Sequence, residues 1–260
     1  MTTTLPSAVA PTTDSDGIRS QRFSTLLSVE LRKLVDTRSG KVLFGSAIAL
    51  TVGLLAWKLT HTSTIPVSFG SYNASVLPAV TFLIPVLGLL AMTGEWTQRT
   101  ALTTFTMAPR RLRVFGAKFS AATLLGLGVL TVTVPVSLGA TALGGAISDH
   151  GATFANVGGE IRSTVIATLL QIVMGAAFGA LIPVTAAALG AFYAAPAVWT
   201  AFAPELLKGN ARWLDIFDAY GRLGSGHPWQ HLAQTLTAAA AWVVLPAAVG
   251  LYRSLRREVK

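Results

Sequence analysis

Uncharged apolar stretches alternate along this chain with short segments that carry its charges. Because a charged side chain at the centre of a bilayer is costly, the charges mark where each stretch leaves the membrane. The longest stretch, 163–204, holds 42 uncharged residues, enough for two crossings of roughly 20 residues each. Pro183 lies at its middle, so we expect a helical hairpin that turns there. The pattern predicts six spans, at 42–59, 74–94, 119–147, 163–182, 184–203 and 232–252.

Two of these spans have unusual lengths. The first has only sixteen uncharged residues between Lys41 and Lys58, and it crosses a bilayer if these lysines extend toward the headgroups. The third has 30 uncharged residues between Lys118 and Asp149. We therefore expect the third span to tilt, to bend at Pro135 or to protrude from the membrane.

The composition is that of an all-α membrane protein. Hydrophobic residues make up 52% of the 260 residues and charged residues only 12%, too few to cover the surface of a soluble domain. The chain has no cysteine, which excludes disulfides, thiolate metal sites and a cysteine nucleophile. Apart from Lys58 at the edge of the first, no ionisable acid or base falls inside a predicted span, which counts against ion-coupled carriers and intramembrane enzymes. Gln171 is the most polar candidate at membrane depth, and it either bonds a neighbouring helix or contacts a substrate in a cleft.

The basic residues are distributed unevenly between the two sides of the membrane. With six spans, 15 of the 20 Lys and Arg residues share one side, so both termini are predicted to be cytoplasmic. Residues 1–22 are predicted to be a disordered cytoplasmic tail, and 23–260 a transmembrane domain in the cell membrane. Because the basic residues lie in short loops beside the membrane, they indicate orientation and contact with lipid, and nucleic acid is excluded as a partner.

Two segments outside the predicted spans have amphipathic patterns. Residues 23–39 form a predicted helix along the cytoplasmic interface, which serves either as an anchor or as a lever to a partner. Its apolar stripe consists of Phe23, Leu26, Leu27, Leu31, Leu34 and Val35. On the outer side, 204–231 contains a second stripe, which predicts either an amphipathic connector or an outer gate. That stripe consists of Trp213, Ile216, Phe217 and Tyr220.

The loop after the second span is too long for a turn and too short for a domain. Glu95 lies four residues before Arg99, so the two are expected to pair on one helix face. A short helix is predicted over 97–107, ended by Pro109, and three arginines follow within four positions. Such arginines also fit a simple role in orientation and lipid contact.

These residues resemble the permease subunits of type-2 ABC exporters. The resemblance rests on Glu95-x3-Arg99-Thr100, the later Pro109-Arg110-Arg111, Lys118 before the third span, and the "elbow" helix before the first span. In that family the loop forms a coupling helix that docks on a separate ATPase subunit. The resemblance therefore implies this role for Glu95, Arg99, Thr100, Pro109, Arg110, Arg111 and Arg113. It implies an elbow role for Glu30, Arg32 and Lys33.

The function that the resemblance implies is export powered by another chain. The sequence lacks G-x-x-x-x-G-K-[ST], so ATP and Mg would be bound by the partner ATPase, and this chain would not be an enzyme. Two permease chains, alike or different, would pair with the ATPase subunits. The alternative is a non-transporting membrane protein with an assembly, immunity or sensor role. The uncharged spans favour apolar or amphipathic cargo.

Overall fold

The computed structural model describes residues 22–63, 66–97, 111–224, 229 and 231–256, and 88% of this part of the chain is helical. Within it no β-strand forms, and one isolated bridge pairs Ser68 with Thr153. The all-α prediction is therefore confirmed. In chain order the helices are α1 (Phe23–Asp36), α2 (Arg38–Leu59), α3 (Phe69–Thr97), α5 (Arg111–Ile147), α6 (Val157–Leu181), α7 (Thr185–Leu207), η1 (Lys208–Trp213), α8 (Ile216–Gly224), α9 (Leu232–Ala239), η2 (Ala240–Val244) and α10 (Leu245–Arg256).

Six helical segments are long and apolar enough to cross a membrane, as predicted. They are α2, α3, α5, α6, α7 with η1, and the continuous run from α9 through η2 to α10. The predicted hairpin is also confirmed, because α6 ends at Leu181 and α7 begins at Thr185, on either side of Pro183. The third span differs most from its prediction. It has 37 residues and begins at Arg111 instead of 119, so at about 1.5 Å per residue it exceeds the roughly 30 Å hydrocarbon core and protrudes.

The first span needs no extended lysine at the end that bears Lys58. Helix α2 begins at Arg38 and has 22 residues, which is sufficient for one crossing. Lys58 is buried, and its Nζ donates to the hydroxyls of Ser71 and Ser75 on α3 at 2.6 and 2.9 Å. The Lys58 side chain thus fastens α2 to α3, and the expectation that it reaches toward the headgroups was wrong.

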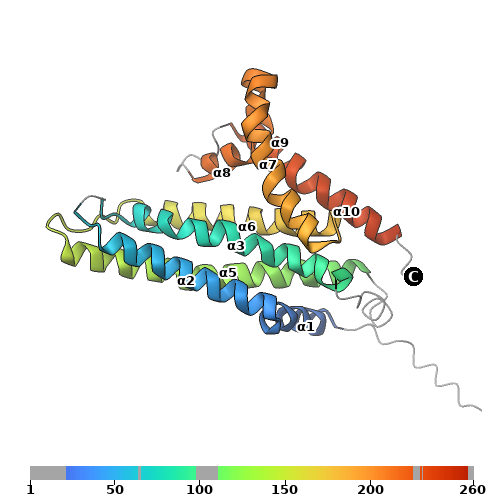
Figure 1. The fold of residues 1–260 in the computed structure, drawn as a ribbon, viewed down its shortest axis with the longest axis horizontal. Helices are drawn as coiled ribbons and strands as arrows, with labels where there is room; N and C mark the ends of the chain where they lie inside the picture. Colours follow the sequence, from blue (N-terminus) through green and yellow to red (C-terminus); the bar gives the residue numbers. More distant parts are fainter. Residues whose placement is uncertain (1–21, 64–65, 98–110, 225–228, 230, 257–260) are drawn as a thin grey trace, which may run out of the picture.

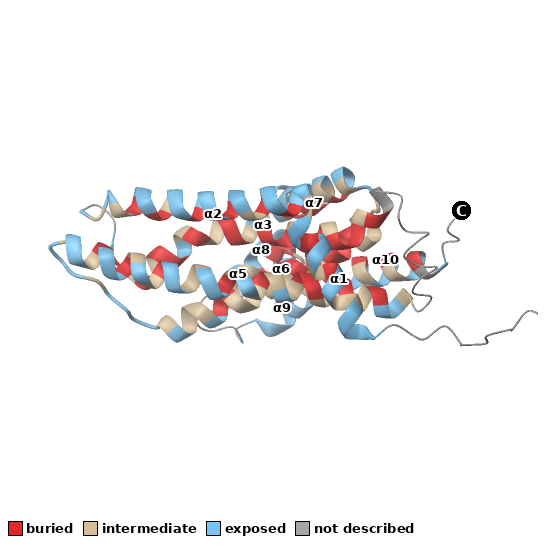
Figure 2. Ribbon diagram, turned by 90° about the horizontal axis from the view of Figure 1, so that it is seen from below, coloured by how far each residue is buried: buried red, intermediate tan, exposed pale blue. Residues whose placement is uncertain are grey.

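Helices α2, α3, α5 and α6 pack lengthwise as an elongated bundle, here called the helical layer, while α7 and α10 incline away from it (Figure 1). Buried residues concentrate on α3 and α6, and long exposed faces remain on α2 and α5 (Figure 2). Those exposed faces are apolar, as at Val42, Ile48 and Val132. Such faces suit contact with lipid or with another apolar chain.

Small residues let α3 and α6 approach closely. A Cβ added to Gly175 would lie 2.1 Å from the carbonyl oxygen of Pro85, and one added to Gly179 would lie 2.7 Å from that of Leu89. Gly88 faces α6 in the same way, with the Ile172 carbonyl oxygen 2.4 Å from its added Cβ. Gly175 and Gly179 are four residues apart and share one face of α6, the small-residue spacing that permits close helix packing.

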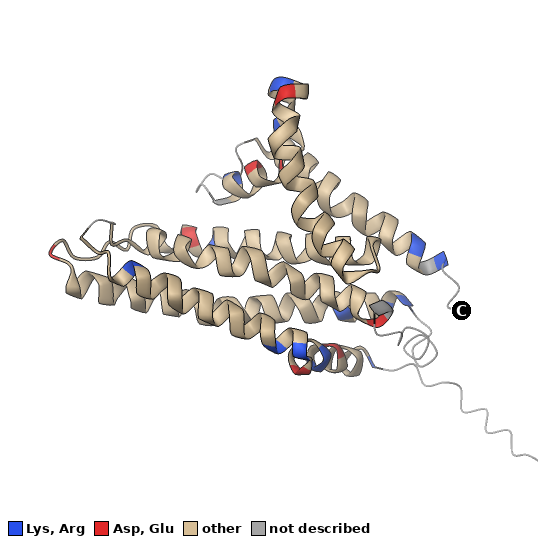
Figure 3. Ribbon diagram, in the orientation of Figure 1, with Lys and Arg blue, Asp and Glu red and all other residues tan. Residues whose placement is uncertain are grey.

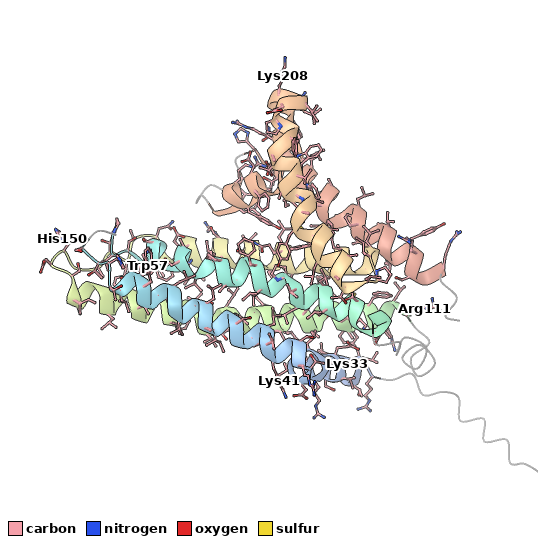
Figure 4. The ribbon with its side chains drawn as sticks, viewed as in Figure 1. Lys33, Lys41, Trp57, Arg111, His150 and Lys208 are labelled. Carbon is pink, nitrogen blue, oxygen red and sulfur yellow. The ribbon has the colours of Figure 1, made fainter. Side chains whose placement is uncertain are left out.

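Two hydrogen bonds join the start of α5, the end of α10 and the α6–α7 turn at one end of the helical layer. Arg111, at the start of α5, donates to the carbonyl of Ser254 in α10 at 2.7 Å, and Arg253 donates to the carbonyl of Leu181 at the α6–α7 turn. The labelled side chains of Lys33 and Arg111 lie at this end, whereas Trp57 and His150 lie at the other (Figure 4). With six crossings, the N-terminal helix, the start of the third span, the α6–α7 turn and the end of α10 must lie on the same side of the membrane, and the structure groups them in this way. The assignment of this end to the cytoplasm stays a prediction.

The last span contains a π-helical turn. Pro246 has no backbone N–H for the carbonyl of Trp242, four residues earlier, and such positions commonly carry a helix irregularity. The turn directs the Trp242 indole Nε1 to the carbonyl of Leu214 at 2.6 Å. This bond ties the last span to the segment between η1 and α8.

The outer amphipathic segment differs in detail from the predicted stripe. Ile216 is buried, but Trp213 and Phe217 are largely exposed. The reason is that α8 begins only at Ile216, so Trp213 belongs to the preceding 3-10 helix η1 and is out of phase with it. Asp215 caps α8 by accepting the backbone N–H groups of Phe217 and Asp218 at 2.9 and 3.1 Å.

We expect Gly175→Ala to destabilise the chain by about 1–3 kcal/mol, because the new methyl group forces α3 and α6 apart. The measurement is the midpoint of thermal unfolding in detergent. Gly190→Ala on α7 is the control, since nothing lies within 4 Å of its added Cβ and alanine favours helix more than glycine. Equal midpoints for the two variants would contradict the close packing.

Candidate functional site

Four charged side chains form a closed ring where α1, α3 and α5 meet. Glu30 accepts from Lys33 at 2.8 Å and from Lys118 at 3.0 Å. Glu95 accepts from the same two lysines, each at 3.1 Å. Acidic and basic groups therefore alternate around the ring, and its net charge is zero. Figure 3 shows that charged residues gather at this end of the layer, away from the largely uncharged middle.

Each member of the ring is positioned by its helix. Glu30 and Lys33 are three residues apart on α1 and so share one face. Glu95 lies at the end of α3, whereas Lys118 lies about two turns inside α5. Three members are buried, with Glu30 and Glu95 5% exposed and Lys118 3% exposed. The side chain of Lys33 is 43% exposed and closes the ring toward the surface.

Pairing makes the burial of these charges tolerable. An unpaired buried ion costs several kcal/mol, whereas excellent geometry and full hydrogen bonding offset that cost. Burial by itself lowers the pKa of Lys33, but the hydrogen bonds and negative charges of Glu30 and Glu95 outweigh burial, and the pKa is raised. The Lys33 ammonium is therefore held in its charged form.

The ring also limits how α1 can move. Helix α1 ends at Asp36 and α2 begins at Arg38, so Thr37 alone separates them, and its hydroxyl accepts from the backbone N–H of Gly40. Gly40 permits this tight joint, since an added Cβ would lie 1.7 Å from the carbonyl oxygen of Leu34. Through the ring, α1 is bound both to the end of α3 and to α5. It thereby bridges the two helices that flank segment 98–110.

The predicted elbow residues have distinct environments. Glu30 and Lys33 belong to the ring, whereas Arg32 is exposed. The predicted apolar stripe is only partly buried, because Leu34 is covered while Phe23 and Val35 are more than 40% exposed. Pairing allows the charged Glu30 to take a buried position on this helix. The orientation of α1 along a membrane surface stays a prediction.

The predicted loop residues are only partly described. Glu95 pairs with Lys33 and Lys118, and its expected pair with Arg99 stays a prediction because Arg99 lies outside the described residues. Four other predicted residues of this stretch lie outside the described part of the chain: Arg99, Thr100, Pro109 and Arg110. Most of the helix predicted at 97–107 lies outside it as well. Arg111 opens α5 and holds the end of α10, and Arg113 lies exposed one half-turn later.

Lys118 is the ring member that sequence reasoning did not assign to the site. It was taken as the boundary of the third span, since a charge normally lies outside the apolar segment. The structure instead begins α5 at Arg111 and buries Lys118 inside it. The available signal was the combination of Glu30, Glu95 and Lys118 beside apolar stretches, because buried charges require partners.

A second feature lies between α3, α6, α7 and α8. These helices line an open cavity of about 750 Å³, within the size range of small-molecule sites. Gln171 lines this cavity. Among the described residues its side-chain amide has no hydrogen-bond partner, so the predicted bond to a neighbouring helix is not formed there. The residues that the structure describes contain no group of three side chains able to hold a metal ion.

Comparison with models of known protein families gives no match, and comparison with curated proteins gives no match either. The function must therefore be argued from the ring, the cavity and the sequence resemblance.

We expect Lys118→Met to cost about 3–5 kcal/mol in stability, because it leaves two buried carboxylates with one half-exposed lysine. Thermal unfolding in detergent measures the loss. Lys118→Met with Glu95→Gln restores a neutral ring and should recover a large part of it.

Lys41→Met serves as the matched control, since Lys41 is exposed at the same end of the layer. It should lower stability by less than about 1 kcal/mol. If the double variant unfolded at a lower temperature than Lys118→Met alone, the ring would not be acting as a charge-balanced unit.

Proposed function

We propose that this chain is the transmembrane permease subunit of an ATP-driven ABC exporter, coupled to a separate ATPase chain. The observation that supports this most is the buried ring of Glu30, Lys33, Glu95 and Lys118. It binds α1 to both helices that flank 98–110, the segment whose sequence resembles a coupling loop. A force applied at that segment would be shared by α1, α3 and α5.

Helix α3 connects this end of the molecule to the cavity. Helix α3 carries Glu95 at one end, and its earlier residues Asn73, Leu77 and Phe82 line the cavity. Close glycine-mediated packing joins α3 to α6, which lines the cavity from the other side. In this proposal, closure of the ATPase shifts the tied helices as a body, and the cavity changes between two arrangements.

The proposed exporter needs a second permease chain, alike or different. The exposed apolar faces of α2, α5 and α7 provide surface for such pairing and for lipid. ATP and Mg belong to the partner ATPase, and the site of action is the cell membrane. This chain contributes the substrate path and performs no catalysis itself.

The direct test is purification of the full chain from its native membranes in mild detergent, followed by identification of proteins present in stoichiometric amount. We expect a soluble ATPase with Walker motifs. Arg99→Ala with Arg110→Ala should reduce its recovery at least about tenfold, because each arginine removed weakens a charged contact. Glu95 is unsuitable for this test, since its removal would also unbalance the buried ring.

Arg212→Ala is the control, because Arg212 is an exposed arginine in η1, outside the predicted coupling loop. It should leave ATPase recovery unchanged. Consistent absence of an ATPase under several gentle conditions would contradict the proposal. That result would favour the non-transporting alternative.

A further inference from the structure

The cavity has walls of aromatic side chains. Phe82 of α3 stacks against Tyr193 of α7 with ring centroids 6.0 Å apart, and Phe192 meets Tyr193 edge-on at 4.7 Å. From α8, Phe217 and Tyr220 line the cavity, and the Tyr220 hydroxyl contacts the sulfur of Met174 at 3.4 Å. Aromatic faces carry partial negative charge and attract cations as well as apolar groups.

One carboxylate lines the same cavity. Glu160 lies in the first turn of α6, and Oε1 of its side chain would be 3.2 Å from a Cβ added to Gly70. Gly70 thus leaves space for the carboxylate between α3 and α6. In the described part of the chain no lysine, arginine or histidine forms an ion pair with Glu160 or lines this cavity. Glu160 therefore places on the cavity wall a carboxylate that forms no ion pair among the described residues.

Uncharged polar groups complete the lining. The side-chain amide of Asn73 donates to the hydroxyl of Thr164 at 2.8 Å, so each of these polar groups has a hydrogen-bond partner within the protein. Gln171, 5% exposed, presents an amide without a partner among the described residues. A ligand or water in the cavity can bond this amide.

We infer that the cavity binds a lipophilic organic cation of drug size. Its apolar body would contact the aromatic walls, its positive charge would be balanced by Glu160, and a polar substituent could bond Gln171. An anion of the same size would be disfavoured by the carboxylate and by the aromatic faces. Export of such a cation rests on the proposed function, whereas its binding does not.

Tetraphenylphosphonium and tetraphenylborate test this inference, because they share size and shape and differ in the sign of their charge. Binding of each radiolabelled ion to the purified full-length chain is measured by equilibrium dialysis in detergent. Glu160→Gln should weaken tetraphenylphosphonium binding at least about tenfold and leave tetraphenylborate binding unchanged or stronger. Phe217→Leu should weaken cation binding by about threefold, since it removes an aromatic face and keeps an apolar side chain.

Two controls separate binding from folding. Glu160→Asp keeps the charge and should retain most of the cation affinity, and Glu205→Gln removes an exposed carboxylate that does not line the cavity. Thermal unfolding of each variant reports whether the fold is kept. An equal change for both ions in Glu160→Gln, or no change relative to Glu205→Gln, would overturn the inference.

The two proposals fail separately. Selective cation binding without a copurifying ATPase would support the cavity inference and contradict the exporter. An ATPase partner without selective cation binding would do the reverse. ATP-driven uptake of tetraphenylphosphonium into inside-out vesicles, lost in Glu160→Gln, would support both together.

Discussion

The ring of alternating charges is the constraint on which the packing of α1, α3 and α5 depends, at the end of the molecule that is predicted to be cytoplasmic. Glu30, Glu95 and Lys118 are buried together, and each would be costly alone. Their pairing, closed by Lys33, requires α1, the end of α3 and α5 to hold one relative position. The ring therefore holds the helix ends together, as apolar packing holds the helices together elsewhere. It also makes α1 part of the helical layer.

The ring holds the end of α3 through Glu95, and close backbone contacts with α6 hold the rest of α3. Gly88, Gly175 and Gly179 bring the two helices to a separation that larger side chains would prevent. In lipid, where apolar side chains gain little from burial, such dispersion contacts hold helices together. Helix α3 thus links a charged joint at one end to the wall of a cavity nearer the other.

The cavity follows from the inclination of α7 and α10 away from the layer. The α6–α7 turn and the end of α10 are bonded together, and Trp242 is bonded to the carbonyl of Leu214. Helix α8 then lies across the opening between α6 and α7 and contributes aromatic rings to it. The carboxylate of Glu160 on α6 forms no ion pair among the described residues, and it places a negative charge among apolar and uncharged polar side chains.

The sequence by itself determined six apolar helices and the turn at Pro183, because hydropathy and proline act locally along the chain. It also singled out Glu30, Lys33 and Glu95. Only the tertiary structure decided their partners. Glu95 has two lysines from other helices, and Lys118 lies inside α5 because partners elsewhere in the chain offset the cost of burying it. Pairing and cavity shape depend on segments that are distant in sequence, and local patterns do not specify which of them meet.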